Sequence, residues 1–124
     1  MKILLKNIIF VSVFCLSQFL FTQNKINKED IKDQIDLLHE KAVAAKQYLD
    51  YNQALNYCEQ ALNLSLKIQD NENEAKTYRI LGNLYYLNND LDTAIEFLGK
   101  ASFIQNKFDY SEELAKTRNV YGLV

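Results

Sequence analysis

Apolar and small residues in the stretch 71–110 recur at helical spacing. Positions 78, 81, 82 and 85 share one helical face and positions 94, 98 and 101 share another, because side chains three or four residues apart lie on the same side of a helix. Between the two runs, Asn88-Asn89-Asp90 consists of residues that tolerate turn geometry. We therefore predict two helices joined by a short turn, with Asp92 as the cap of the second helix.

Residue size on these two faces predicts how the helices pack. Small side chains at Gly82, Ala94 and Ala101 let two antiparallel helices approach closely. Bulkier side chains fill the space beside them, namely Tyr78, Leu81, Tyr85, Ile95 and Leu98. A large residue at Gly82 or Ala94 should therefore separate the pair.

This helical pair belongs to a repeat. Residues 75–84 are nearly copied by residues 115–124, at an offset of 40. The same offset extends backwards to a weaker first copy, which aligns Ala42 with Gly82, Tyr57 with Phe97, Ala54 with Ala94 and Ala61 with Ala101. The predicted units are 31–70, 71–110 and 111–124. The fold class is thus an all-α solenoid of antiparallel helix pairs, whose incomplete last repeat suggests a fragment of a longer protein.

Polar stretches at 69–74 and 109–113 lie where one unit passes into the next, and we place the extra length of the 40-residue period there. Their glutamates favour the first turn of a helix, where the helix dipole is positive. Asn71 or Asn73, and Ser111, are the predicted capping residues.

The second unit resembles the tetratricopeptide repeat, a helix–turn–helix unit with an aromatic residue, Leu-Gly, Tyr, then Ala, an aromatic residue and Ala. In this chain the residues at those positions are Tyr78, Leu81, Gly82, Tyr85, Ala94, Leu98 and Ala101. Leu98 departs from the pattern, as does Asn106 at the usual proline position. An armadillo or other paired-helix repeat is the alternative, because those periods also lie near 40. The Leu-Gly-x-x-Tyr signature argues against it.

The resemblance, which covers residues 31–124, implies a superhelix that binds a protein or peptide through its concave face and has no enzymatic activity. The implied groove positions are Lys76, Arg79, Asn83, Tyr86, Lys116 and Asn119, with Leu123 following and with Asp36, His39 and Val43 in the first unit. Arg79, Asn83 and Lys116 form a donor-rich patch able to hold a carboxylate. This patch is similar in part to the carboxylate clamp with which some tetratricopeptide repeat proteins bind peptide C-termini.

The N-terminal segment has a different character. Met1-Lys2 and Lys6 precede an apolar run from Ile8 to Phe21, which is the layout of a secretory signal peptide over residues 1–23. An uncleaved anchor over residues 3–22 is the alternative. Lipidation at Cys15 is disfavoured by the bulky Phe14 before it. The repeat domain then covers residues 24–124.

The composition of the chain argues against some classes of function. The 124-residue chain has no proline, three glycines and a formal net charge of −2, and it lacks the basic face that nucleic-acid binders show. No catalytic, metal or cofactor constellation is evident. His39, the only histidine, is predicted to be solvated helix surface. Cys58 is predicted to be a small buried hydrophobe, and the run from Asp70 to Glu74 lacks the ligand spacing of an EF-hand.

The sequence thus predicts an exported interaction scaffold, found in the periplasm, on the cell surface or secreted, with a protein or peptide as its partner. One alternative is the extracytoplasmic sensor region of a longer signalling protein, either a histidine kinase or a transcription regulator. Another is a scaffold anchored by lipid. Contact with a membrane would arise through the N-terminal segment or a region downstream. Neither the ligand nor the oligomeric state follows from these residues.

Overall fold

The computed structural model describes residues 1–123, apart from the side chain of Ile26. Within these residues the regular structure consists of helices, and the all-α prediction is confirmed. The helices are α1 (Lys2–Gln47), α2 (Tyr51–Lys67), α3 (Asn71–Leu87), α4 (Leu91–Lys107) and α5 (Ser111–Tyr121). The chain divides into two units, Met1–Ile31 and Lys32–Val124, so α1 contributes to both. Val124, the last residue of the predicted third repeat, lies outside the described residues.

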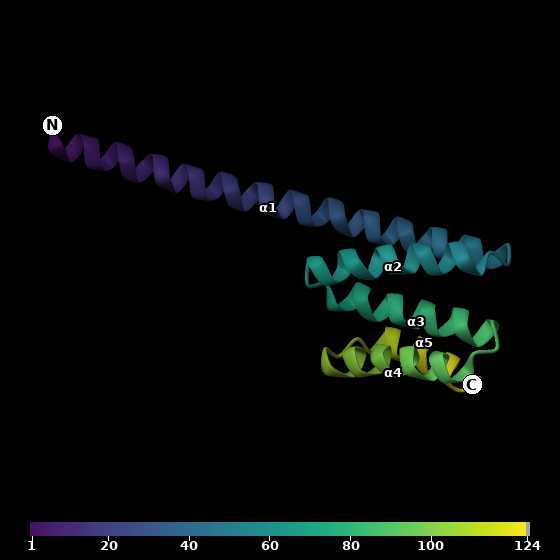
Figure 1. The fold of residues 1–124 in the computed structure, drawn as a ribbon. Coiled ribbons are helices and arrows are strands. Elements are labelled where there is room, and N and C mark those ends of the chain that lie inside the picture. Colours follow the sequence, from purple (N-terminus) through teal and green to yellow (C-terminus); the bar gives the residue numbers. More distant parts are fainter. Residues whose placement is uncertain (124) are drawn as a thin grey trace. The chain divides into compact units, whose positions relative to one another are not determined.

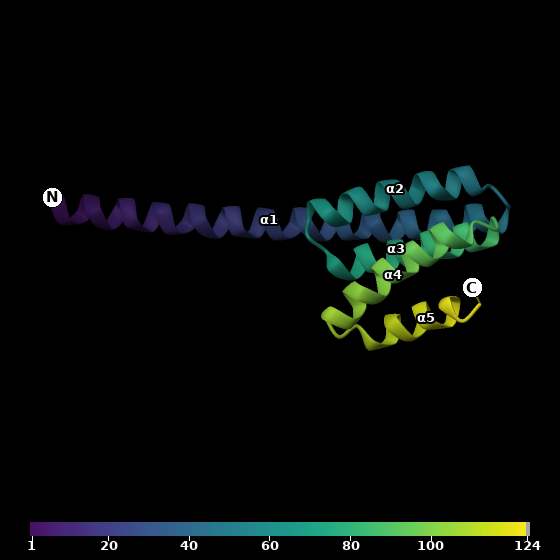
Figure 2. The same ribbon diagram turned by 60° about the horizontal axis from the view of Figure 1, so that its bottom comes forward.

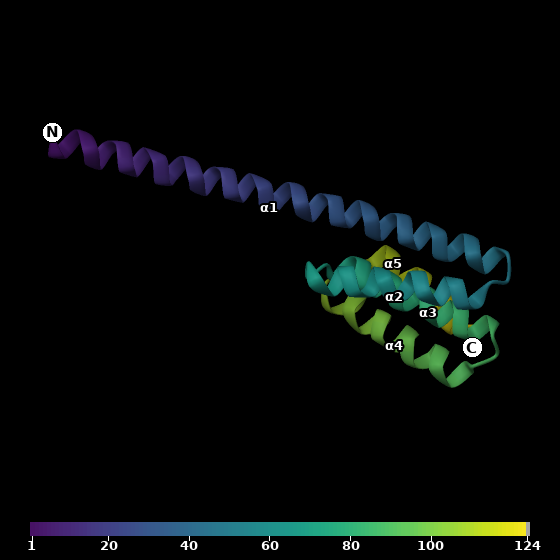
Figure 3. The same cartoon turned by 45° about the horizontal axis from the view of Figure 1, so that its top comes forward.

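In the second unit, successive helices are antiparallel neighbours. The chain direction reverses at each turn from α2 through α3 to α4 (Figure 1), and Figure 2 shows α5 returning after α4. Helix α3 contacts both α2 and α4 and lies between them in the view of Figure 1, whereas in Figure 3 α2 passes in front of α3. Helix α5 contacts α4 and α3. This arrangement is a solenoid of stacked helix pairs.

The turns between helices share one geometry. Helices α2 to α5 begin at residues 51, 71, 91 and 111, and each connection is three residues long. Each contains a residue with positive φ, at Leu49 (60°), Gln69 (54°), Asn89 (63°) and Asp109 (58°). The residue after the positive-φ residue donates its backbone N–H to the carbonyl five residues earlier, as Asp70 does to Ser65 at 2.9 Å. This pattern closes a helix C-terminus and satisfies its last carbonyls. The polar stretches 69–74 and 109–113 are therefore mainly helix beginnings.

The capping residues differ from those predicted. Asp50, Asp70 and Asp90 cap α2, α3 and α4, each accepting a bond from the backbone N–H three residues on, at 3.1 to 3.2 Å. Asp92, Asn71 and Asn73 are not the caps, because the capping residue must directly precede the first helical residue. Ser111 is also not a cap, since α5 begins with it and Tyr110 precedes it without a side-chain bond.

The core lies where α1, α2, α3 and α4 meet. Its buried cluster consists of Ala42, Ala54, Cys58, Ile80, Leu81 and Leu84. Gly82, Ala94, Leu98 and Ala101 are also buried, and the half-buried Tyr78 and Tyr85 pack against the cluster. The prediction for Ile95 was wrong, because its side chain is 43% exposed. Phe97 fills that space instead, with its ring centroid 5.9 Å from Tyr78 and 5.5 Å from Tyr85.

Cys58 is buried as predicted. Burial raises the pKa of its thiol to about 12. The thiol is therefore neutral at physiological pH, and Cys58 acts as a small apolar side chain.

The N-terminal unit is a single helical segment. Among the described residues, α1 alone is long and apolar enough to cross a membrane by length and composition, with an 18-residue window of mean hydropathy 2.0 near the N-terminus. A signal sequence meets the same criterion.

Candidate functional site

A groove of about 650 Å³ lies between the C-terminal part of α1 and α3. We call it the α1–α3 groove. Helix α1 lines it with residues spaced three or four apart, which therefore share one face. Its lining residues are Asp36, His39, Glu40, Val43, Ala44 and Gln47 from α1, with Lys76, Arg79 and Ile80 from α3. The groove thus combines a charged end with a small apolar end.

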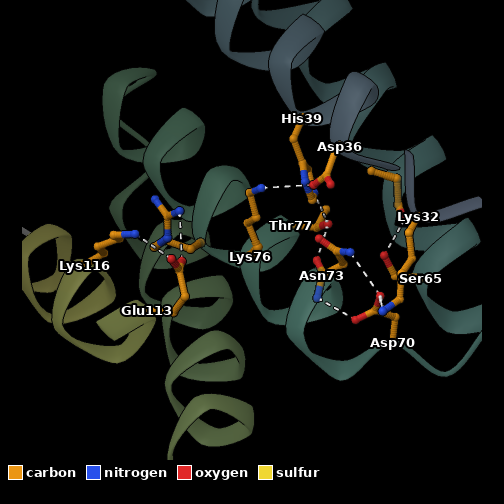
Figure 4. A network of polar contacts seen from close by, with 12 residues as sticks. Lys32, Asp36, His39, Ser65, Asp70, Asn73, Lys76, Thr77, Glu113 and Lys116 are labelled. Atoms are coloured by element: carbon orange, nitrogen blue, oxygen red, sulfur yellow. Dashed lines mark hydrogen bonds and ion pairs between the residues drawn. The ribbon is translucent and has the colours of Figure 1, made fainter. Parts of the chain in front are cut away.

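The cations of α3 are paired with carboxylates of the neighbouring helices. Lys76 Nζ lies 3.3 Å from Asp36 Oδ1, across the groove on α1 (Figure 4). Arg79 Nη2 donates to Glu113 Oε2 of α5 at 3.3 Å. The more exposed Lys76–Asp36 pair contributes about 0–1 kcal/mol, so its main effect is to fix where the charges lie, whereas the Arg79–Glu113 pair is partly buried.

Glu113 lies between two residues of the predicted carboxylate patch, Arg79 and Lys116. Its second oxygen, Oε1, accepts from Lys116 Nζ at 2.7 Å (Figure 4), so one carboxylate bridges Arg79 and Lys116. Burial alone would raise the pKa of Glu113, but hydrogen bonds and charge from Lys116 and Arg79 hold it below its usual value. Glu113 is therefore ionised at neutral pH. An incoming carboxylate would have to displace it.

His39 is a buried residue, and the prediction of a solvated surface position was wrong. Its side chain is 3% exposed, and Nε2 lies 2.7 Å from Thr77 Oγ1 on α3 (Figure 4). Burial and the nearby charge of Lys76 lower its pKa to about 4, against an opposing effect of Asp36. His39 is thus a neutral imidazole at the floor of the groove.

Comparison with known proteins gives one match. The family model described as Tetratricopeptide repeat matches residues 33–107, more than half of the chain. The chain belongs to the tetratricopeptide repeat family. No curated protein and no solved structure matches it. Repeats of this family serve as scaffolds that bind proteins or peptides, and they are typically not catalytic.

In the tetratricopeptide domain, the predicted groove residues do not all meet in one place. Lys76 and Arg79 line the α1–α3 groove, and Lys116 joins Arg79 only through Glu113. Asn83 lies further along α3, where its Oδ1 accepts from Lys46 Nζ at 3.2 Å. Tyr86 is half-buried and Asn119 is exposed, on α3 and α5 respectively. The residues therefore form a row along the first helices of the repeats.

Sequence reasoning missed Thr77 and Glu113, which bond the groove residues His39 and Arg79, and it missed Lys46, which bonds Asn83. Thr77 bonds a residue 38 positions away, and Glu113 bonds one 34 positions away. A usable signal was present for Thr77, since Thr117 repeats it at the 40-residue offset and is also fully buried. Thr117 bonds Gln105 at 2.7 Å, so a buried threonine that bonds a neighbouring helix occurs in both units.

Proposed function

We propose that the repeat domain binds an extended segment of a protein or peptide in the α1–α3 groove. The observation that carries the proposal is the groove itself, in which charged and hydrogen-bonding side chains adjoin the apolar Val43, Ala44 and Ile80. Pockets of this composition bind ligands because apolar contact supplies affinity while a few polar groups fix orientation. Of the row that comprises Lys76, Arg79, Asn83, Tyr86, Lys116 and Asn119, the first two line this groove. We propose that the bound segment continues from the groove along the other four.

A groove-blocking substitution tests this proposal. Peptides are first selected from a displayed random library for binding to the full chain in a mild detergent. Ala44→Trp places a large ring in the groove at an exposed position, and it should weaken the selected peptide by at least about tenfold. Fluorescence anisotropy with the labelled peptide measures the affinity.

The matched control is Asn63→Trp, an equally exposed helical position on α2 that does not line the groove. It should leave the affinity unchanged. Equal affinities for the Ala44→Trp and Asn63→Trp variants would show that the selected peptides bind elsewhere, and the proposal would fail.

We also propose that residues 1–23 direct the chain to an extracytoplasmic compartment. The apolar window near the N-terminus supports this, since a signal sequence needs such a segment after its basic start. Expression of the chain in its native cells should yield a mature protein that begins near Asn24. N-terminal sequencing reads this directly, and a mature chain that still begins at Met1 would exclude cleavage.

A further inference from the structure

Helix α4 carries an exposed apolar row. Residues four apart form a straight row along a helix, and this one consists of Leu91, Ile95, Gly99 and Phe103. We call it the α4 ridge. Its three large side chains, in chain order, are 40%, 43% and 69% exposed. In the view of Figure 3, α4 lies at one edge of the second unit, with α2 and α3 on its other side.

The repeat pattern does not account for the second half of the α4 ridge. At the 40-residue offset, α2 carries Glu59 and Asn63 where α4 carries Gly99 and Phe103. Phe103 is the most exposed residue of the ridge, so it adds little to the core of the repeats. Neighbouring exposed apolar side chains mark contact surfaces more often than isolated ones do. The ridge therefore has the character of a contact surface.

Gly99 forms a notch in this ridge. A glycine inside a helix reduces its stability, so its presence there needs a reason. Gly82 has one, because Leu98 would lie 2.6 Å from its Cβ atom. Gly99 has no positive φ, and within the described residues a Cβ there would have only Tyr121 Oη near it, at 3.4 Å. The notch is thus free to receive a side chain from another molecule.

Two copies of the α4 ridge complement each other in size when they run antiparallel. A two-fold axis near position 97 places residue 95 opposite the partner's residue 99, and residue 91 opposite the partner's residue 103. Ile95 of each copy then fills the notch at the partner's Gly99, and Leu91 lies against the partner's Phe103. Parallel pairing would instead place the two notches together and leave a gap.

The charges that flank the ridge favour the same direction. Asp92 and Glu96 lie in the first half of α4, whereas Lys100 and Lys107 lie in the second half, and all four are exposed. Antiparallel pairing brings the acidic half of each copy to the basic half of the other, and parallel pairing would oppose like charges. Glu96 already bonds Lys100 of its own helix at 2.6 Å, so the charges select direction more than they add affinity.

We propose that the chain forms a two-fold symmetric dimer in which the α4 ridges of two copies pack antiparallel, with Ile95 of each copy in the notch at the partner's Gly99. The dimer does not depend on the proposed function, because α4 does not line the α1–α3 groove. One helix per copy is a small contact for a stable dimer, so we expect a dissociation constant of about 1–100 μM.

Disulfide trapping in the full chain tests the direction of pairing. Leu91→Cys and Phe103→Cys are each made in a Cys15→Ser background, in which the remaining Cys58 is buried. In mild detergent, the mixed variants should form a linked dimer several-fold faster than either variant alone. Positions 91 of the two copies would lie about 18 Å apart along antiparallel helices, whereas a disulfide needs Cα atoms within about 7 Å.

Sedimentation velocity of the full chain, in density-matched detergent, measures the affinity. Ile95→Lys should weaken the dimer at least about tenfold, because it places an ammonium group in the contact. The matched control is Leu66→Lys on α2, where the leucine is 49% exposed, and it should leave the affinity unchanged.

A second variant separates shape from mere apolar character. Gly99→Leu adds apolar surface but fills the notch, so it should also weaken the dimer at least about tenfold. A non-specific apolar patch would instead associate more strongly when a leucine is added.

The proposal would be overturned by a chain that stays monomeric at concentrations well above the expected dissociation constant. It would also be overturned if Leu91→Cys or Phe103→Cys alone formed linked dimers as fast as the mixture. Equal affinities of Ile95→Lys and Leu66→Lys would place the association on another surface, such as the N-terminal apolar segment. The proposed function is judged separately, by the groove-blocking variant and its control.

Discussion

Gly82→Ala should destabilise the repeat domain by about 1–2 kcal/mol, although alanine is the better helix former. A Cβ atom at position 82 would lie 2.6 Å from Leu98 Cγ and 2.8 Å from its Cδ2, well inside contact distance. Leu98 is fully buried, and the backbone oxygen of Ala94 lies 3.2 Å from the same point. Neither α3 nor α4 can therefore take up the extra methyl group without a shift. Urea unfolding followed by circular dichroism measures the loss.

Gly99 provides the matched control for this prediction. A Cβ there would have Tyr121 Oη as its nearest neighbour at 3.4 Å, which is an ordinary contact. Gly99→Ala should therefore stabilise the domain by about 0.5–1 kcal/mol through helix propensity alone. Leu98→Ala alone should cost about 2–5 kcal/mol, and in its background Gly82→Ala should no longer destabilise. Equal stability of the two glycine variants would contradict the account of α3–α4 packing.

Lowering the pH from about 6.5 to about 4 should remove up to about 3 kcal/mol of stability through His39. Burial lowers the pKa of His39 from 6.5 to about 4 in the folded chain, with Lys76 and Arg79 acting in the same direction and Asp36 and Asp70 opposing them. Because the unfolded chain binds the proton first as the pH falls, protonation favours unfolding over this interval. Above pH 6.5 and below pH 4 the contribution of His39 is constant.

The imidazole resonances of the single histidine report this titration directly. We expect a midpoint near 4 in the folded chain, and a midpoint near 6.5 would contradict the buried position of His39. His39→Gln is the control for stability, since it removes this titration. The pKa of Glu113 is held low, so Glu113 loses its stabilising effect only at more acidic pH. It does so equally in the original chain and in the His39→Gln variant.

The repeat and its core follow from local pattern, which explains why they were predictable. Helical spacing and residue size place Leu81, Gly82, Ala94 and Leu98 in the α3–α4 interface, where they are buried. The capping residues were predicted wrongly because several aspartates and asparagines adjoin each turn. Composition alone does not show which of them directly precedes the helix. The positive φ angles at Leu49 and Gln69 have no sequence signal of their own, since neither residue type favours that conformation.

The floor of the groove was not predictable, because it depends on contacts between repeats. His39 has polar and apolar helical neighbours, and only the stacking of α1 on α3 brings Thr77 against it. Glu113 reaches Arg79 only because α5 packs beside α3. Pairings of this kind depend on the relative position of two helices, which spacing within one helix does not specify.

The location of a bound peptide tests the central claim most directly. A peptide selected on the full chain can be added to the ¹⁵N-labelled protein, and the shifted backbone amides can be mapped. We predict shifts concentrated on the α1 residues 36–47 and the α3 residues 76–80, which line the groove. Shifts confined to α2 and α4 would contradict the claim that this groove is the binding surface.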